Sequence, residues 1–376
     1  DRDVTGVQTC ALPIWIMDKK LQEIGDKVAQ HIRLNKEDGI YLYQSDDLLA
    51  IGEIARARKL EKTGRHVYFN VNRHINLTNI CISRCHFCAF GVEENGNGGP
   101  YVMSPEEAFE FGAEAVDYGI TEFHVVSALH PKKPFDYYVE VIRRLHDAYP
   151  HIHIQAFTAV EIFYFAQISG LSVREVLTTL KEVGLGSMPG GGAEVFNDDI
   201  RRELCPRKAM SDDWLEVHRT AHELGIKTNC TMLYGHMESI EDRINHFIRL
   251  RELEDQAPGF QSFIPLPFLP ENTKLSHIRR TSAIDDLKTM AIARLMLDNI
   301  DHIKAFWIML GIPLAQIALE FGADDLDGTI VEERIMHSAG AQTEKGIDKG
   351  TIIELIRESG YTPVERDTLY NIIEIF

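Results

Sequence analysis

The sequence lacks the features that mark a nucleic-acid-binding protein or a membrane protein. Lys and Arg number 39 against 57 Asp and Glu, so the chain has a net charge of −18 and no excess of basic residues. Its most apolar run, residues 305–319, is too short to cross a bilayer and contains Gly311 and Pro313. No basic segment precedes an apolar run near the start, so we expect no signal peptide. We therefore expect a cytoplasmic protein with no nucleic-acid partner and no membrane partner.

Cysteine is scarce as well, with six residues in 376, which excludes a disulfide framework. Three of the six, Cys81, Cys85 and Cys88, lie within eight residues in the spacing C-x3-C-x2-C. Thiols gathered in this way indicate a reducing compartment and a bound metal, because thiolates are soft ligands.

The alternation of strand-like and helix-like segments from His66 onward predicts the fold. Roughly seven or eight strands alternate with helices over about 260 residues. Strands that are apolar throughout are typical of parallel sheets buried on both faces. We therefore predict an α/β protein built on a (β/α)8 TIM-type barrel. A doubly wound open sheet is the alternative, but no G-x-G-x-x-G follows an early strand.

The sequence divides into four parts on this interpretation. Residues 1–16 are expected to be a non-native tail, because residues 1–14 resemble a translated sequencing adapter. Residues 17–63 are expected to form an N-terminal helical preface, in which apolar side chains recur at helical spacing. Residues 64–340 would form the barrel, and residues 341–376 a C-terminal helix and tail that cap it.

Several kinds of site would suit the three clustered thiols. A structural zinc uses four ligands, usually in two pairs, but Cys205 and Cys230 stand alone in the sequence. The pair Cys85-x-x-Cys88 could also be a redox dithiol. Three thiolates on a loop after the first barrel strand fit better with a 4Fe-4S cluster, in which they hold three irons and leave the fourth open.

Other candidate residues follow the predicted strands, where the functional side chains of a barrel lie. Ser127 and Ala128 end the second strand, and Glu161 follows the third. His236 follows the fifth and could donate to a substrate carboxylate or transfer a proton. The simpler explanations are an ordinary loop for Ser127 and Ala128, a helix cap for Glu161 and a buried core position for His236.

A glycine segment, PGGGAE, follows the fourth predicted strand. Gly190 and Gly191 lack side chains, so the backbone can approach a ligand and offer its N–H groups to an anion. Glu194 ends the segment and is a candidate catalytic residue together with His236. A plain flexible turn is the alternative interpretation.

The cysteine spacing, with Phe87 before the last cysteine and a barrel behind it, resembles that of the radical S-adenosylmethionine enzymes. The resemblance implies that the open iron binds the amino and carboxylate groups of S-adenosylmethionine. It also implies that an electron from a donor such as flavodoxin or ferredoxin leads to methionine and a 5'-deoxyadenosyl radical. Phe87 would lie by the adenine, Ser127 and Ala128 by the methionine amino group, and Glu161 by the ribose hydroxyls or an amino group.

The segments EFHVVSALHP, SMPGGGAEVF, TMLYGH and LDGTIVEERIMHSAGA are similar to those of the radical enzymes of the futalosine route to menaquinone, in particular the aminofutalosine synthases. The similarity covers about Gly64 to Tyr370, with Ser127-Ala128 where the pattern usually has two glycines. It implies addition of the radical to 3-[(1-carboxyvinyl)oxy]benzoate, giving aminodeoxyfutalosine, methionine and bicarbonate.

Two other functions stay open from the sequence. The related dehypoxanthine futalosine cyclase shares the PGGGAE and YGH motifs and uses the radical to abstract hydrogen and close a ring. A non-catalytic protein with a zinc ion or a redox dithiol is the alternative from another class. The two carboxylates of the synthase substrate require cationic or amide donors, for which Arg73, His74 and Arg84 are unranked candidates.

Overall fold

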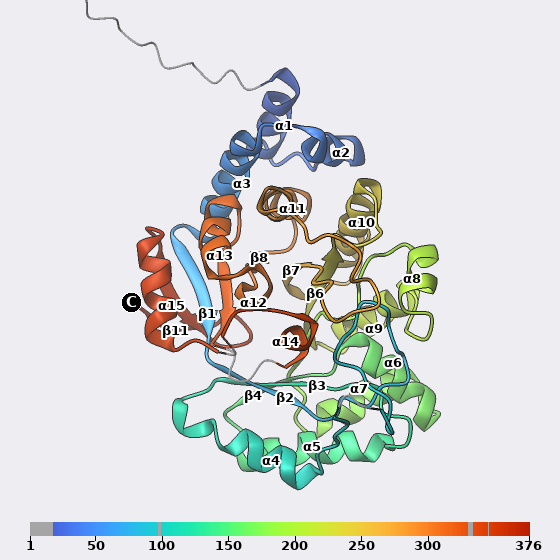
Figure 1. The fold of residues 1–376 in the computed structure, drawn as a ribbon. Helices are drawn as coiled ribbons and strands as arrows, with labels where there is room; N and C mark the ends of the chain where they lie inside the picture. Colours follow the sequence, from blue (N-terminus) through green and yellow to red (C-terminus); the bar gives the residue numbers. More distant parts are fainter. Residues whose placement is uncertain (1–17, 97–98, 330–333, 345) are drawn as a thin grey trace, which may run out of the picture.

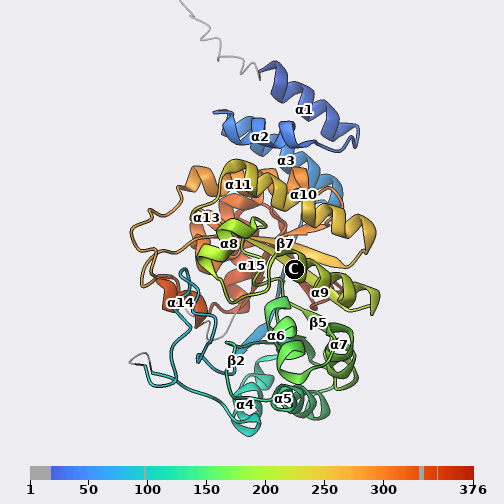
Figure 2. The same ribbon diagram turned by 90° about the vertical axis from the view of Figure 1, so that its right-hand side faces the viewer.

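The computed structural model describes residues 18–96, 99–329, 334–344 and 346–376. The predicted tail, residues 1–16, lies outside this part of the chain. The first described elements are three helices, α1 (Lys19–Ala29), α2 (Lys36–Gln44) and α3 (Leu48–Thr63). Asp18, Asn35 and Asp47 cap their N-termini, each side chain accepting from backbone N–H groups of the first turn. The three helices form a layer at one end of the molecule, against α10 and α11 (Figures 1 and 2).

The strands of the barrel follow one another around a ring, as the sequence predicts. The first is interrupted at residue 71, giving β1 (His66–Asn70) and β2 (Asn72–Asn76). The strands from β2 to β8 pair in parallel in chain order, and β9 pairs in parallel with β1. A parallel bridge between Lys304 and Asp325 joins β8 to β9, which closes the ring. The remaining strands of the ring are β3 (Glu122–Val126), β4 (His153–Ala156), β5 (Ser187–Met188), β6 (Lys227–Tyr234), β7 (Phe260–Pro267), β8 (His302–Ile303) and β9 (Asp325–Gly328).

Most of the helices surround this ring (Figure 1). They are α4 (Pro105–Ala113), η1 (Val116–Tyr118), α5 (Phe135–Ala148), α6 (Ala159–Ser169), α7 (Val173–Glu182), α8 (Asp198–Leu204), α9 (Ser211–Glu223), α10 (Ile240–Gln256), α11 (Ala283–Met296), α13 (Ile312–Ala318), η2 (Leu319–Phe321) and α15 (Lys349–Glu358). Two short helices, α12 (Trp307–Leu310) and α14 (Ile335–Ala339), instead contribute side chains to a cavity inside the ring. Among the described residues, no helix has both the length and the apolar character needed to cross a membrane. The predicted TIM-type barrel is confirmed.

Two local predictions differ from the structure. The apolar segment 303–309 reads as one strand, but β8 ends at Ile303 and α12 begins at Trp307. A short apolar run suits a buried helix as well as a strand, and the indole N–H of Trp307 is fixed by donating to the carbonyl of Gly328 at 3.0 Å. The C-terminal tail also does more than cap the barrel. Its strands β10 (Thr362–Arg366) and β11 (Ile372–Ile375) extend the sheet from β1, with β10 parallel to β1.

The closing strand β9 is anchored by buried charge. Asp324, which precedes it and is fully buried, accepts from Nδ1 of His302 at 2.6 Å and from the backbone N–H of Ile303 at 2.8 Å. It also pairs with the guanidinium of Arg294, which is buried on α11. Burial alone would raise the pKa of Asp324, but the Arg294 and His302 charges outweigh burial and lower the pKa to about 2.

Replacing Asp324 tests how much this anchor contributes to stability. Asp324→Asn leaves Arg294 buried without its counter-charge, so we expect the free energy of unfolding to fall by about 3–5 kcal/mol. Because the pKa of the folded carboxyl is lowered, its stabilising effect is complete above the ordinary Asp range and is lost as pH falls toward 2. Urea unfolding followed by circular dichroism at pH 7 measures the change.

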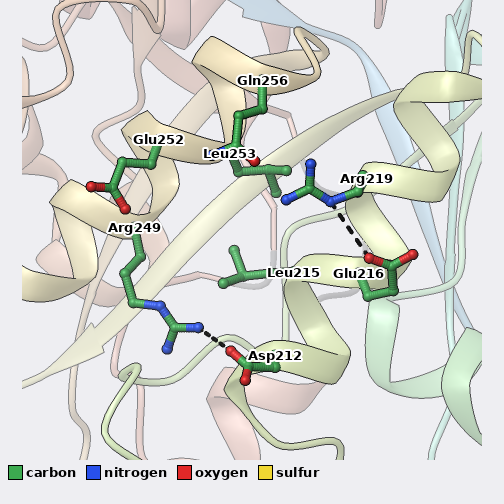
Figure 3. A pocket seen from close by; sticks show the side chains of 8 residues that line it. All are labelled: Asp212, Leu215, Glu216, Arg219, Arg249, Glu252, Leu253 and Gln256. Atoms are coloured by element: carbon green, nitrogen blue, oxygen red, sulfur yellow. Dashed lines mark hydrogen bonds and ion pairs between the residues drawn. The ribbon is translucent and has the colours of Figure 1, made fainter.

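The matched control is Asp212→Asn on α9. Asp212 pairs with Arg249 across an outer groove between α9 and α10 (Figure 3), and its side chain is 91% exposed. Exposed pairs of this kind contribute about 0–1 kcal/mol, so this variant should unfold close to wild type. Equal losses in the two variants would contradict the anchoring role of Asp324.

Candidate active site

The carboxyl ends of the barrel strands surround a cavity of about 370 Å³. Its lining joins the cysteine loop to the ends of the strands and to several side chains inside the ring. The sequence-predicted residues that line the cavity are Cys81, Cys85, Phe87, Cys88, Ser127, Ala128, Glu161, Gly190, Gly191 and Glu194. Among the residues predicted to be catalytic or to bind a cofactor or metal, His236 does not line it.

The cysteine loop leaves β2 and is held by its own backbone. The N–H of Cys81 donates to the carbonyl of Val92 at 3.1 Å, and the N–H of Val92 donates to that of Asn79 at 2.8 Å. These bonds fold the loop back on itself. The N–H of Cys88 donates to the carbonyl of Cys85 at 3.2 Å, which forms a tight turn between these two cysteines. These backbone hydrogen bonds hold the loop in a conformation in which all three cysteines line the cavity.

Gly91 lies close to the sulfurs of both Cys81 and Cys88. A Cβ at this position would lie 3.1 Å from Cβ of Cys81, 3.8 Å from its Sγ and 3.9 Å from Sγ of Cys88. The N–H of Gly91 also donates to Sγ of Cys88 at 3.4 Å, a contact that favours a thiolate. Burial raises the pKa of the Cys88 thiol, so a metal must displace a proton to bind there.

The chemistry of the donor set fits an iron–sulfur cluster. Cys81, Cys85 and Cys88 come from one loop and all three line the same cavity. Thiolates are the ligands that hold 4Fe-4S clusters, and three of them would leave the fourth iron open. The three residues present therefore fit such a cluster.

The end of β3 is joined to the cysteine loop and to α6. The N–H of Ala128 donates to the carbonyl of Thr78 at 3.1 Å, and the N–H of Ile82 donates to that of Leu129 at 3.0 Å. The N–H of Ser127 donates to Oε1 of Glu161 at 2.6 Å. Ser127 and Ala128 thus lie beside the cysteine loop, and their contact with S-adenosylmethionine stays a prediction.

Glu161 caps α6 and lines the cavity at the same time. Its Oε2 accepts from the N–H of Thr158 at 2.8 Å and from the hydroxyl of Thr158 at 2.7 Å. Burial raises its pKa to about 7, against the lowering effect of the bonds from Thr158 and Ser127. The helix-cap interpretation of Glu161 is correct, and its contact with a ligand stays a prediction.

The glycine segment is shaped mainly by packing inside the protein. A Cβ on Gly190 would lie 2.6 Å from Cα of Cys230 on β6, and one on Gly191 would lie 3.0 Å from Cγ2 of Thr158. The carbonyl of Gly190 accepts from the hydroxyl of Thr231 at 2.7 Å. These contacts explain the glycines without a ligand and make the segment a rigid part of the cavity wall.

Glu194 has a partner that the sequence does not reveal. Nζ of Lys208 lies 2.7 Å from its Oε1 and 5.1 Å from the ring centre of Phe87. Burial alone would lower the pKa of Lys208, but the Glu194 carboxylate raises it above its ordinary value. Both side chains line the cavity, so an ammonium and a carboxylate stand next to the predicted adenine-side residue. Lys208 follows α8 and not a strand. The expectation that functional residues follow strands therefore did not predict it.

His236 is enclosed by its own turn. Its Nδ1 accepts from the N–H of Met237 at 2.7 Å and its Nε2 lies 3.0 Å from the carbonyl of Leu233, while the side chain has no exposed surface. Burial lowers its pKa. Both ring nitrogens are therefore engaged away from the cavity, and the catalytic role of His236 stays a prediction without a cavity contact.

Polar side chains inside the ring of strands, called the polar floor below, also lie at the cavity. The expectation that functional residues follow the strands, called the strand-end rule below, did not indicate them. His74 and His124 stack with ring centres 4.5 Å apart, and Nδ1 of His124 lies 3.3 Å from Oε1 of Glu122. Nζ of Lys304 donates to Oδ1 of Asp327 at 2.7 Å, and both residues line the cavity. Of the unranked carboxylate-binding candidates, His74 and Arg84 reach the cavity lining and Arg73 does not.

The cluster assignment is tested by removing its ligands one at a time. Cys81→Ala, Cys85→Ala and Cys88→Ala should each lose most of the bound iron, because three thiolates leave no spare ligand. Activity should fall by at least about a thousandfold. Iron and sulfide analysis after anaerobic reconstitution, with the broad visible absorbance, gives the result. Cys230→Ala is the control, since Cys230 is buried on β6 and its Sγ donates to the carbonyl of Ser262 at 3.5 Å. Full iron in a Cys88→Ala protein would refute the assignment.

Comparison with known proteins agrees with this geometry. Residues 75–250 match the family described as the radical SAM superfamily, and residues 257–376 match the family described as the CofH/MqnC C-terminal region. The aminodeoxyfutalosine synthase of Thermus thermophilus is 44% identical over 96% of this chain and 98% of its own. That of Streptomyces coelicolor is 42% identical over 95% of both chains.

A relative with a different activity has a similar sequence identity to this chain. The 5-amino-6-(D-ribitylamino)uracil–L-tyrosine 4-hydroxyphenyl transferase of Methanopyrus kandleri is 42% identical over 86% of this chain and 88% of its own. Among solved structures, methylornithine synthase has a TM-score of 0.73 at 20% identity and covers 90% of this chain and 97% of its own. The hydrogenase maturase HydG has a TM-score of 0.72 at 18% identity, over 92% of this chain and 75% of its own. At these identities the two structures establish the fold.

Proposed function

This chain belongs to the radical S-adenosylmethionine superfamily, and we propose that it is an aminodeoxyfutalosine synthase that acts in menaquinone biosynthesis. The reaction transfers a 5'-deoxyadenosyl group to 3-[(1-carboxyvinyl)oxy]benzoate and yields aminodeoxyfutalosine, methionine and bicarbonate. The observation that carries the proposal is the identity of 42–44% to two bacterial synthases over nearly the whole of each chain.

The residues that line the cavity support this proposal. Cys81, Cys85 and Cys88 would hold a 4Fe-4S cluster, which would supply radical chemistry with S-adenosylmethionine as co-substrate. Glu161 fixes the backbone of Ser127 where the co-substrate would lie, and the protein's own contribution there is orientation.

Lysines that line the cavity supply the positive charge that a dicarboxylate requires. Lys304 stands at the end of β8, is 5% exposed and lines the cavity with Asp327 as its partner. Lys208 and Lys274 line the same cavity. A substrate with two carboxylates gains charge-assisted hydrogen bonds from such groups. We assign to Lys304 the binding of one substrate carboxylate, because Lys304 lies inside the ring of strands.

Two other radical reactions are the competing functions. The CofH/MqnC C-terminal match and the 42% identity to the archaeal transferase favour a second candidate, a transferase that joins a tyrosine-derived group to a ribitylaminouracil. The dehypoxanthine futalosine cyclase is the other. All three share the cluster and the barrel, so the substrate decides between them. A flavodoxin or ferredoxin is the proposed electron donor, and the cytoplasm is the proposed location.

Product analysis distinguishes these functions. Anaerobic enzyme with dithionite, S-adenosylmethionine and 3-[(1-carboxyvinyl)oxy]benzoate should give one covalent adenosine–benzoate product per methionine, measured by liquid chromatography and mass spectrometry. Parallel reactions contain dehypoxanthine futalosine, or tyrosine with the ribitylaminouracil. Product in either parallel reaction, with only free 5'-deoxyadenosine in the first, would overturn the synthase assignment.

The carboxylate anchor is tested by Lys304→Gln. Loss of a charged hydrogen bond worth about 1.5–3 kcal/mol should raise the KM for the benzoate substrate by about 10- to 100-fold. The KM for S-adenosylmethionine should stay within about twofold. Lys62→Gln is the control, because Lys62 pairs with Asp301 at 2.9 Å and does not line the cavity. An unchanged benzoate KM in Lys304→Gln would remove Lys304 from the binding site.

A further inference from the structure

His124 stands in the polar floor with its ring held on two sides. The register of the parallel pair β2–β3 puts His124 opposite His74, and the two rings stack with centres 4.5 Å and planes 16° apart. Nδ1 of His124 lies 3.3 Å from Oε1 of Glu122, which is two residues earlier and therefore on the same face of β3. The side chain of His124 keeps 19% of its surface exposed and lines the cavity. The ring is therefore fixed and still accessible to a ligand.

Glu122 can fix this ring because two other parts of the chain hold its carboxylate. Its Oε2 accepts from the hydroxyl of Thr368 at 2.8 Å and from Nδ2 of Asn70 on β1 at 3.1 Å. Thr368 lies in the turn between β10 and β11, so the C-terminal tail reaches the interior of the barrel here. Glu122, Asn70 and Thr368 are 3%, 1% and 2% exposed, which keeps water from competing with these hydrogen bonds.

The carboxylate decides which ring nitrogen of His124 carries a hydrogen. Burial alone would raise the pKa of Glu122, but the hydrogen bond and charge of His124 lower it well below its usual range. An ionised carboxylate only accepts, so Nδ1 is the donor in this contact. Nε2 is then the ring nitrogen left for a ligand, and no hydrogen bond from the described residues occupies it.

We propose that His124 binds the second carboxylate of the benzoate substrate through Nε2, with Glu122 and Thr368 as positioning residues that fix its ring. The inference rests on the proposed function, in which Lys304 binds the other carboxylate. With hydrogen on both nitrogens, the ring donates to Glu122 and to the substrate at once, and such charge-assisted hydrogen bonds are the strong ones. Stacking on His74 keeps the donor in place, so little conformational freedom is lost on binding.

The experiment measures the dissociation constant of the benzoate substrate by isothermal titration calorimetry. It uses the full chain with its cluster reconstituted and no reductant, so that no turnover occurs. His124→Phe keeps a ring beside His74 but removes Nε2, and should raise the constant about 10- to 100-fold. Thr368→Val removes one donor to Glu122 and should raise it about 3- to 10-fold, while Thr368→Ser should restore it to within about twofold. The dissociation constant of S-adenosylmethionine should stay within about twofold in each variant.

The matched control is Thr351→Val, on the same C-terminal part of the chain. The hydroxyl of Thr351 donates to Oδ2 of Asp348 at 2.6 Å, away from the cavity, so this variant should bind both ligands as wild type does. An unchanged benzoate constant in either His124→Phe or Thr368→Val would overturn the proposal. A Thr368→Val effect that Thr368→Ser does not reverse, or that extends equally to S-adenosylmethionine, would also overturn it, because it would reflect packing in general.

The wild-type titration separates this inference from the function on which it rests. Wild type that fails to bind the benzoate substrate would overturn the synthase assignment and the inference together. Binding by wild type that none of the variants weakens would overturn the inference alone and leave the synthase assignment in place.

Discussion

Two adjacent buried aspartates hold the ring of strands closed, and the cavity depends on that closure. Asp324 binds His302 and Arg294 on the β8 side, while Asp325 accepts from Nε of Arg366 at 2.7 Å and from the hydroxyl of Tyr370 at 2.8 Å on the tail side. The pairing between β8 and β9 is only a short bridge, so these charges replace a longer ladder. Without them the side chains on β8 and β9 would not face a common cavity.

The sequence identified the cysteine loop as part of the site because its signal is local, and the structure places this loop on the cavity. Cys81, Cys85 and Cys88 lie in one loop, and their spacing alone suggests a cluster. The strand-end rule then placed Ser127 and Glu161 correctly on the cavity, since the ends of parallel strands share one face of a barrel. His236 obeys the same rule but turns inward on Leu233 and Met237, which depends on the conformation of a single turn.

Residues that the sequence could not reveal reach the cavity through tertiary structure. His124 and Lys304 belong to the strand ladders themselves, and which of their side chains point into the ring follows from strand tilt and register. Lys208 lies on the loop after α8, which no periodic pattern in the sequence marks. Gly190 was predicted from the sequence to let the backbone approach a ligand, and the structure shows that the backbone of β6 also requires a glycine there. Its contact with a cofactor stays a prediction.

The interrupted first strand links the C-terminal tail to the cysteine loop. Its first half, β1, pairs with β10, which in turn pairs with β11, and its second half, β2, leads into the cysteine loop. The residues from Thr362 to Ile375 and the loop that carries Cys81 therefore depend on the same strand for their position. Truncation of the tail would expose the outer edge of β1 and loosen the strand from which the cysteine loop begins.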